Sequence, residues 1–525
     1  MELLWRADDG PDDTPLVPGA THDVIVVGAG VTGLTTALML VREGYDVAVV
    51  EAERIGALAS GANTGKLSLL QGSVLSTLRR HHPASLARAY VEANRDGAQW
   101  LRDFAAEAGV PLSSRTAFSY AQSDAGASTI DDETAAAAEA GLPVRRVPAG
   151  ADADLPFPFA AAVALDDQAA LDPQRLLHAL ARAFLAAGGT LHTGARVTRV
   201  HAVPSPCIET DAGSMRADHI VLATGAAILD RGLYFAKTRG LRSYCVAFAY
   251  DGDVPDGLYL SVDGPTRSIR SVTPEDGPGD RAQLIVGGNG HPVGRVKSEQ
   301  ERVDDIVAWT REHFPGAEPV AHWSAQDYES HNLIPFVGAL PRSLGRVRFA
   351  TGYGKWGLSN GPAAALRLSA EIRRVPRRER PRWMSVIAHR LTVPADLGRG
   401  GVENIRVGWE AASGWLGAQR VPVPVPRPAE GEGVVASRGG QPVGVSTVDG
   451  VTRAVSAVCT HLGGVLSWND AECTWDCPLH ASRFTADGER IEGPALDDLP
   501  RLDDSSAPAV EGDPGVTRSR AQERR

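Results

Sequence analysis

The chain has 525 residues, of which 43% are hydrophobic and 22% charged, a composition typical of globular proteins with more than one core of roughly 150 residues. Its 56 glycines and 35 prolines follow no collagen-like period, which excludes a fibre and a wholly disordered chain. The formal net charge of −11 disfavours a general affinity for nucleic acid or an anionic membrane, so small molecules or soluble proteins are the expected partners.

The start of the sequence lacks a basic segment followed by an apolar one, so no secretory signal is predicted. The longest apolar run, residues 24–40, is too short and too rich in Gly and Thr to span a bilayer. We therefore expect a cytoplasmic protein without a membrane span. Five cysteines are too few for a disulfide scaffold, but Cys459 and Cys477 share a short window with two histidines.

The first predicted elements form a βαβ unit after a polar arm at residues 1–22. A strand at Val24–Val27 leads into a glycine turn, a helix with apolar residues from Val31 to Val41, and a second strand at Val47–Val50.

Residues 80–140 predict Ala-rich helical segments that alternate with loops, and Pro173–Gly189 predicts a helix capped by Asp172. His219–Thr224 is a buried-strand run, and residues 240–290 are rich in strand-like segments. A sheet-bearing substrate domain inserted between two pieces of the first domain explains this order.

Residues 376–427 are rich in Arg and Pro, which predicts a linker with a helix inside it. The stretch 505–525 has almost no large apolar residue and predicts a disordered tail. The expected parts are an arm (1–22), a discontinuous dinucleotide-binding domain (23–80, 150–230 and 330–375), a substrate domain (81–149 and 231–329), the linker (376–427), a β domain (428–504) and the tail (505–525).

Gly28, Gly30 and Gly33 form a G-x-G-x-x-G turn between a strand and a helix, the context in which this motif binds a dinucleotide. They allow, in turn, the tight bend, the approach of the pyrophosphate and the packing of helix on strand, and the helix N-terminus faces the phosphates. Glu51 closes the second strand, where an acid accepts the ribose hydroxyls. A glycine-rich turn of an unrelated α/β fold is the alternative, which Glu51 disfavours.

A second glycine-rich stretch, residues 284–294, superficially resembles another dinucleotide turn. Its spacing is wrong, and Pro292 is followed by a charged stretch without an amphipathic helix or an acid-ended strand. We interpret this stretch as a hairpin in the substrate domain, so no nicotinamide site is predicted.

Cys459-Thr-His461 and Cys477-Pro-Leu-His480 put one Cys and one His on each of two loops. Two thiolates and two imidazoles suit tetrahedral zinc or an iron–sulfur cluster. Zinc fingers use C-x-x-C and H-x-H blocks, whereas one Cys and one His per loop is the Rieske pattern, in which both Cys bind one iron and both His the other. We predict a [2Fe–2S] cluster on these four residues, with structural zinc as the alternative. The remaining cysteines are predicted bystanders: Cys207, Cys245 and Cys473.

The segment RIGALASGANTGKL after Glu51 resembles the one with which the D-amino-acid-oxidase/glycine-oxidase family of flavoproteins wraps the FAD pyrophosphate and ribityl chain. Residues 171–173, 194–197 and 223–225 also resemble that family, and residues 351–361 resemble its C-terminal flavin contact. The resemblance implies FAD as the cofactor and these further contacts: Arg54, Ser60, Asn63, Thr64, Lys66, Val197, Thr224, Gly225, Gly354, Lys355, Trp356 and Gly357.

The same resemblance suggests catalytic candidates. Lys355 is the candidate for the positive charge that stabilises a reduced, anionic flavin, with a solvated loop lysine as the alternative. His331 and Tyr353 are candidates for lining the flavin, with structural roles as the alternative. Asn332 stands where relatives have an acid before a proline, which puts that family role in doubt. An amino-acid carboxylate needs an arginine clamp, for which the candidates are Arg239, Arg242, Arg267 and Arg270.

The loops CTHLGG and WDCPLHASRF resemble Rieske loops, but they differ from the respiratory-complex proteins. Gly464 and Leu479 replace the two cysteines whose disulfide joins the loops there, which implies a ferredoxin-type domain with a lower potential within the range of about −150 to +300 mV. Ala481 stands where glycine usually follows the ligand histidine.

As a whole, the sequence resembles bacterial FAD-dependent oxidoreductases of the amino-acid-oxidase fold with a C-terminal Rieske domain. The implied fold is α/β and α+β: a Rossmann-type FAD-binding domain, an inserted antiparallel-sheet substrate domain and a small all-β Rieske domain. The implied enzyme oxidises a C–N bond of an amine or amino-acid-like small molecule by hydride transfer to flavin. Electrons then pass to the cluster and on to an external acceptor, which we expect to be soluble.

Two alternatives remain open. One is an electron-transfer component that serves a partner enzyme, and the other is a non-catalytic redox sensor. The basic run at residues 373–382 is interpreted as a solvated helix end rather than a docking site for an acidic partner.

Overall fold

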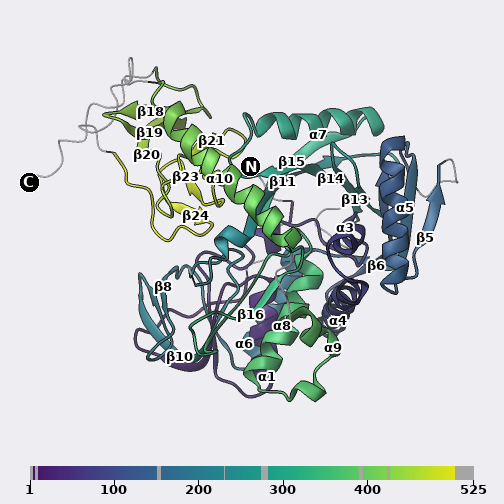
Figure 1. Cartoon of the computed structure of the whole chain (residues 1–525), viewed down its shortest axis with the longest axis horizontal. Helices are drawn as coiled ribbons and strands as arrows, with labels where there is room; N and C mark the ends of the chain where they lie inside the picture. The colour runs from purple at the N-terminus through teal and green to yellow at the C-terminus, as the bar shows by residue number, and fades with distance from the viewer. Residues whose placement is uncertain are drawn as a thin grey trace, which may run out of the picture. The chain divides into compact units, whose positions relative to one another are not determined.

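The computed structural model describes residues 4–5, 10–149, 155–229, 231–273, 282–388, 394–421 and 426–502. The predicted tail and parts of the predicted arm and linker lie outside these ranges. The chain divides into two compact units, shown together in Figure 1. The first comprises Met1–Thr238, Arg242–Gly290 and Arg302–Leu397, and the second comprises Arg239–Leu241, His291–Glu301 and Gly398–Arg525.

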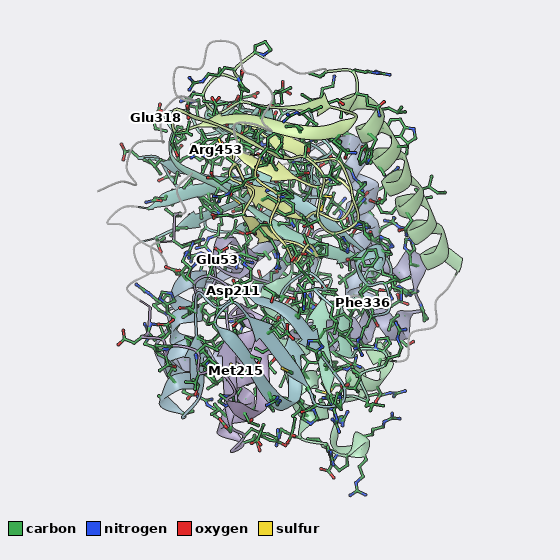
Figure 2. The ribbon with its side chains drawn as sticks, turned by 90° about the vertical axis from the view of Figure 1, so that its left-hand side faces the viewer. Glu53, Asp211, Met215, Glu318, Phe336 and Arg453 are labelled. Atoms are coloured by element: carbon green, nitrogen blue, oxygen red, sulfur yellow. The ribbon has the colours of Figure 1, made fainter. Side chains whose placement is uncertain are left out.

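The first unit contains an eight-stranded, mainly parallel sheet. Its central order is β16 (Phe336–Ala339), β17 (Val347–Thr351), β10 (Gly213–Leu222), β1 (Thr21–Val27), β2 (Val47–Val50) and β7 (Thr190–His192). Beside this path, β9 (Cys207–Thr210) pairs with β10, and β8 (Val197–His201) pairs with β9. β1 pairs in parallel with β10 and β2, as expected for strands joined by crossover connections. The continuously buried runs are Val24–Val27 of β1, Val47–Val50 of β2 and Ile220–Leu222 of β10; Met215 of β10, labelled in Figure 2, is also fully buried.

Three helices pack together beside this sheet: α1 (Val31–Arg42), α6 (Pro173–Ala186) and α8 (Gly357–Ile372). The predicted βαβ unit is confirmed, although β1 begins at Thr21, inside the predicted arm. The cap of α6 is also confirmed, because the carboxylate of Asp172 accepts hydrogen bonds from the backbone of Gln174 at 2.9 Å and of Arg175 at 3.1 Å.

A nine-stranded sheet forms the substrate part of the chain. Its order is β15 (Glu318–Ser330), β11 (Thr238–Ala249), β14 (Gln283–Pro292), β13 (Arg267–Val272), β12 (Leu258–Ser261), β4 (Ser113–Ala121), β6 (Ala161–Ala170) and β3 (Lys66–Leu67), with β5 (Arg145–Pro148) beside β6. The pairs formed by β13 with β12 and β14 are antiparallel, while β12 and β4 run parallel.

Helices α3 (Val74–His81), α4 (Ala84–Ala108) and α5 (Asp124–Glu139) account for the Ala-rich region, but β4 lies among them and was not predicted. The chain also forms α2 (Ala59–Ala62), α7 (Gln300–His313), α9 (Arg382–Ala388) and short 3-10 turns at Phe235–Lys237 and Arg377–Glu379. The glycine-rich stretch at 284–294 belongs to β14, which supports the hairpin interpretation because β14 pairs with β13. The charged stretch 295–299 is not helical, and α7 begins directly after it at Gln300.

The second unit holds two small antiparallel sheets and most of the long helix α10 (Pro394–Ala418). One sheet consists of β18 (Gly433–Arg438), β19 (Gln441–Val448) and β20 (Val451–Ser456). The other consists of β21 (Ser467–Asn469), β22 (Thr474–Asp476), β23 (Arg483–Thr485) and β24 (Arg490–Glu492). Trp475 and Phe484, both fully buried, lie in the core around this second sheet. The predicted helix within the Arg/Pro-rich region is present as α10.

Candidate functional site

The glycine turn is shaped by backbone contacts that leave no space for side chains. A Cβ atom on Gly28 would lie 2.6 Å from the carbonyl oxygen of Ala223, and one on Gly33 would lie 1.9 Å from that of Gly28. Gly28 also has a φ of 107°, in the region that favours glycine. Gly30 caps α1, and a Cβ there would lie 2.8 Å from Oγ of Ser60. The turn therefore exposes the N-terminus of α1 as a surface for phosphates.

Glu51 lies directly beside this turn, at the end of β2. Its carboxylate accepts hydrogen bonds from the backbone N–H of Ala29 at 2.7 Å and of Glu53 at 3.0 Å. Burial raises the pKa of the Glu51 carboxyl, although the hydrogen bonds from these two N–H groups act in the opposite direction. The structure thus brings the predicted ribose acceptor within one hydrogen bond of the glycine turn.

Residues 60–66 connect the turn to the substrate sheet. The hydroxyl of Ser60 accepts a hydrogen bond from the N–H of Val31, the first residue of α1, at 3.1 Å. Asn63 shapes the bend, since its Oδ1 accepts from the N–H of Gly65 at 2.7 Å. Thr64 follows, and its carbonyl accepts a hydrogen bond from Arg270 at 2.8 Å. The predicted contacts from Ser60 to Lys66 therefore form one continuous path.

Lys66 ends this path on β3. Its Nζ donates to the hydroxyl of Ser268 at 2.6 Å and to the carbonyl of Tyr259 at 2.9 Å. Burial, reinforced by the charge of Arg270, lowers the pKa of Lys66 to about 7. Lys66 is thus able to exchange a proton near neutral pH.

The loop between β17 and α8 contains the second group of predicted flavin contacts. Gly354 and Lys355 have φ values of 57° and 77°, and the N–H of Gly354 donates to the carbonyl of Tyr328 at 2.9 Å. The Nζ of Lys355 donates to the hydroxyl of Ser243 at 2.7 Å. Trp356 caps α8, which Gly357 begins.

Lys66 and Lys355 approach the same part of the substrate sheet. Burial raises the pKa of the Cys245 thiol to about 12, and the charges of Lys66 and Lys355 act against that increase. A Cβ on Gly287 would lie 3.0 Å from Sγ of Cys245 and 3.9 Å from Cβ of Ser268, to which Lys66 donates. Ser243 and Cys245 are two residues apart on β11 and therefore share a face of the sheet. We call this surface the lysine face: Lys66, Ser243, Cys245, Ser268 and Lys355. Cys245 is thus one of its components, whereas sequence reasoning treated it as a bystander.

Three other predicted positions are held by local structure. The hydroxyls of Tyr353 and Thr32 lie 2.9 Å apart, and burial raises the pKa of Tyr353. His331 is half-buried and donates its backbone N–H to the carbonyl of Lys237 at 2.9 Å. The side chain of Asn332 accepts from Ser330 at 3.1 Å and so stabilises the turn after β15.

The remaining predicted cofactor contacts lie around the ends of the parallel strands. Val197 is buried at the start of β8, and the hydroxyl of Thr224 donates to the carbonyl of Ala226 at 2.6 Å. The carbonyl of Gly225 accepts a hydrogen bond from the hydroxyl of Thr351. Arg54 is exposed in the turn after Glu51. Thr224 and Gly225 lie with the glycine turn. Among the described contacts, none links Val197 or Arg54 to the lysine face.

Most of the arginines predicted to bind a substrate carboxylate form ion pairs or hydrogen bonds within the fold instead. Arg267 is buried, where it pairs with Asp305 at 2.7 Å. Arg270 donates to the carbonyls of Thr64 and Gly65 at 2.8 and 3.1 Å. Arg242 donates to Gln326 at 3.3 Å, and Arg239 belongs to the second unit.

Sequence reasoning missed the role of Trp5. Its indole N–H donates to the carbonyl of Asn63 at 2.8 Å, and its ring lies 5.5 Å from the guanidinium carbon of Arg270. The predicted arm therefore supports the segment from Ser60 to Lys66. An aromatic residue in an otherwise polar stretch was the available signal.

A dinucleotide such as FAD fits these residues. The glycines allow the close backbone packing of the turn, α1 offers its N-terminus to the pyrophosphate, and Glu51 can accept ribose hydroxyls. The path from Ser60 to Lys66 then leads from the phosphates to the lysine face.

The second candidate centre consists of the two Cys/His loops. Cys459 and Cys477 are buried, with exposed fractions of 3% and 2%. The hydrogen bond between their sulfurs lowers the pKa of Cys459 to about 7 and raises that of Cys477. The backbone N–H groups of His461 and Leu462 also favour the thiolate of Cys459, and those of Leu479 and His480 favour the thiolate of Cys477. Each loop therefore stabilises negative charge on its own sulfur.

The imidazoles of His461 and His480 lie together. The rings of His461 and His480 are 5.2 Å apart and nearly perpendicular. Burial, together with the charges of His461 and Arg295, lowers the pKa of His480 to about 4, so its ring is neutral and able to bind metal. Among the described residues, no three His, Cys, Asp or Glu side chains form a single-ion site.

The β domain around these loops rests on one buried ion cluster. Arg483 contacts Glu472, Asp476 at 3.0 Å and Glu492 at 3.0 Å, and all four side chains are nearly inaccessible. Burial would lower the pKa of Arg483, but the three carboxylates outweigh it and raise that pKa. Ala481, two residues earlier, has a φ of 63°, which explains why glycine is the common residue at this position. Its N–H donates to the carbonyl of Cys477 at 3.0 Å.

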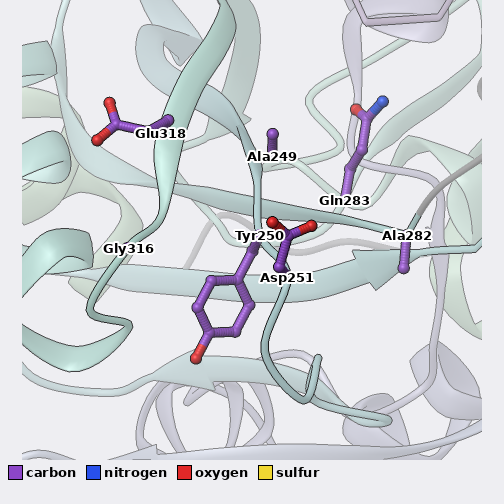
Figure 3. A pocket seen from close by; sticks show the side chains of 7 residues that line it. All are labelled: Ala249, Tyr250, Asp251, Ala282, Gln283, Gly316 and Glu318. Carbon is purple, nitrogen blue, oxygen red and sulfur yellow. The ribbon is translucent and has the colours of Figure 1, made fainter.

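A cavity of about 450 Å³ opens elsewhere on the substrate sheet (Figure 3). It is lined by Ala249, Tyr250, Asp251, Ala282, Gln283, Gly316 and Glu318. Gln283 begins β14, whereas a Cβ on Gly290 near the other end of that strand would lie 2.5 Å from Nζ of Lys355. The cavity and the lysine face are therefore separated by most of the length of β14, and the cavity contains no predicted site residue.

Two family models match this chain. A model described as FAD dependent oxidoreductase matches residues 23–371, and one described as Rieske [2Fe-2S] domain matches residues 423–503. No helix in the described part of the chain is long and apolar enough to cross a membrane.

Individual proteins match either the whole chain or a part of it. The Rieske 2Fe-2S iron-sulfur protein YhfW of Bacillus subtilis (strain 168) is 27% identical over 96% of this chain and 97% of its own length. Gamma-glutamylputrescine oxidoreductase of Escherichia coli (strain K12) is 39% identical over 18% of this chain and 22% of its own. The crystal structure of glycine oxidase from Bacillus cereus ATCC 14579 shares the fold over 71% of this chain and 99% of its own, with a TM-score of 0.58 and 17% identity.

Proposed function

Because this chain belongs to the FAD-dependent oxidoreductase family and carries a Rieske [2Fe–2S] domain, we propose that it oxidises the C–N bond of an amino-acid-like amine. The predicted fold class, the enzyme class and both cofactors are confirmed by these matches. When bound, FAD supplies a two-electron hydride acceptor, and the cluster supplies a one-electron outlet to an external acceptor.

One observation carries the proposal: a single segment links the phosphate end of the cofactor site to the lysine face. Ser60 contacts the first residue of α1, and Lys66, six residues later, contacts Ser268 on the substrate sheet. The glycine turn and α1 would hold the phosphates of the cofactor, and the two lysines at the other end of this segment would attract a small anionic substrate.

The two lysines can act on different groups of the substrate. Lys355, whose Nζ contacts Ser243, is placed to attract the carboxylate of an amino-acid-like substrate. Lys66, whose pKa is about 7, can take one proton from the substrate ammonium at its Nζ. The neutral amine then loses a hydride from its carbon and becomes an iminium, which water hydrolyses.

Similar proteins support this substrate class without identifying the substrate. Gamma-glutamylputrescine oxidoreductase and glycine oxidase are named for molecules that carry an amino group. The proposed cluster ligands are Cys459, His461, Cys477 and His480, and the electrons leave the cluster for an acceptor that we expect to be soluble.

A panel of compounds under anaerobic conditions tests the proposal. It should pair amino acids with the amines that lack their carboxylate, such as glycine with methylamine, and include NADPH as a separate reductant. We expect an amino acid to bleach the flavin absorbance more than its decarboxylated partner. Reduction by NADPH and by no amine would overturn the proposal in favour of an electron-transfer component.

A further inference from the structure

The two ligand loops lack the disulfide that joins such loops in respiratory Rieske proteins. Gly464 and Leu479 occupy those positions, and a Cβ on Gly464 would lie 2.6 Å from Cδ1 of Leu479. Leu479 thus fills the space between the loops. Van der Waals contact gives packing but no directional bond, so another element must fix the loops.

Arg295 supplies a directional bond to the second loop. Its Nε–H donates to the carbonyl oxygen of Pro478 at 2.8 Å, between the proposed ligands Cys477 and His480. Its Nη1 pairs with Glu403 on α10 at 2.7 Å. The side chains of Arg295 and Glu403 are only 11% and 10% exposed, so solvent screens this pair weakly.

The segment that carries Arg295 is itself fixed to the β domain. The carboxylate of Asp470 accepts hydrogen bonds from the hydroxyl of Ser298 at 2.6 Å and from the N–H of Glu299 at 2.8 Å. The carbonyl of Gly294 accepts from Ser467 at 3.0 Å. These contacts on both sides of Arg295 lie within the second unit, although the segment comes from the chain before α7.

Helix α10 also holds the first loop. The indole N–H of Trp415 donates to the carbonyl of Gly463 at 3.2 Å, close to the proposed ligand His461. Twelve residues earlier on the same helix, Glu403 holds Arg295 against the second loop. One helix therefore braces both ligand loops.

We propose that Arg295, held by Glu403, is a positioning residue that takes the place of the missing disulfide and sets the reduction potential of the cluster. The potential of an iron–sulfur cluster depends on nearby charge and hydrogen bonds. Reduction adds a negative charge, which the cation of Arg295 stabilises and the carboxylate of Glu403 opposes.

Arg295 and Glu403 carry opposite charges, so their removal should shift the midpoint potential in opposite directions. A purely structural role would not predict opposite shifts. Arg295→Met removes the cation and should lower the midpoint potential. Glu403→Gln leaves the cation uncompensated and should raise it. Arg295→Lys keeps the charge and one donor, so its potential should stay nearest to that of the unchanged protein.

The experiment is a dye-equilibrated titration of the full-length holoprotein, in which cluster reduction is followed by its EPR signal. Iron and FAD content are measured in parallel. Arg501→Met is the matched control, because Arg501 pairs with Glu489 where both side chains are 62% exposed. This control should leave the potential unchanged.

Opposite shifts for Arg295→Met and Glu403→Gln support the proposal. Shifts of the same sign, or potentials that match the Arg501→Met control, overturn it. If Arg295→Met fails to retain iron, the other two variants decide: a raised potential for Glu403→Gln with a near-native one for Arg295→Lys supports the proposal, and any other pair contradicts it.

Discussion

The hydroxyl of Tyr353 lies 2.9 Å from the hydroxyl of Thr32, in the first turn of α1. This contact joins the loop before α8 to the helix that begins at the glycine turn. Tyr353 was predicted as a candidate for lining the flavin, with a structural role as the alternative. The contact supports the second role, since the phenol is bonded to the helix of the dinucleotide site.

Tyr353→Phe tests this role. Burial raises the pKa of the phenol, which favours the protonated form and disfavours a role as general base. We expect the variant to lose about 0.5–1.5 kcal/mol of stability from the missing hydrogen bond. The pH profile of flavin reduction should keep its shape, and loss of one limb of that profile would contradict the assignment.

Gly30→Ala tests the phosphate surface. The added Cβ would lie 2.8 Å from Oγ of Ser60, so the capping hydroxyl must shift away from the start of α1. We expect at least a tenfold loss of FAD affinity with the cluster spectrum intact. Gly408→Ala on α10 is the control, since its Cβ would meet no atom within 4 Å. Full flavin content in Gly30→Ala would contradict the proposed role of this turn in binding the cofactor phosphates.

Lys66 predicts a pH dependence. Its pKa is lowered to about 7 by burial and Arg270, so the fraction of neutral amine that can accept a proton grows as pH rises through 7. The rate of flavin reduction by a substrate amino acid should rise through that pH. Lys66→Met should lower the rate and abolish the rise, while Lys297→Met, at an exposed position, should change neither. An unchanged rise in Lys66→Met would refute the proton-acceptor role.

Arg483→Met tests the buried ion cluster of the β domain. Removal of the guanidinium leaves Glu472, Asp476 and Glu492 buried without their cation. Loss of one partner from a buried ion cluster costs about 3–5 kcal/mol. We expect a loss of that size in denaturant unfolding of the β domain, against less than about 1 kcal/mol for the exposed Arg501→Met.

The sequence predicted the parts of the fold whose signal is local. The pattern from Val24 to Glu51 has the period of a strand, a helix and a strand with glycines only where the backbone is crowded, and the structure shows that unit. Cys459 and Cys477 could be paired with their histidines because each loop contains a complete half of the ligand set.

Other features depend on contacts that spacing does not show. Trp5 lies in a polar stretch, yet its indole supports Asn63. Arg295 looked like part of an unstructured charged run, because its partners Glu403 and Pro478 are far along the chain. The arginine clamp was expected from the chemistry of a carboxylate, but Arg267 and Arg270 neutralise or bind groups of their own fold.

The most direct test of the account is an anaerobic titration of the holoprotein with an amino acid that reduces it, with flavin absorbance and the cluster EPR signal recorded on the same samples. Each substrate molecule would supply two electrons, and the proposed cluster ligands would hold a one-electron acceptor for them. We predict bleaching of the flavin together with growth of the reduced-cluster signal, and loss of only that signal in a His461 variant. Flavin bleaching with no cluster signal, or a cluster signal that persists unchanged without His461, would contradict the account.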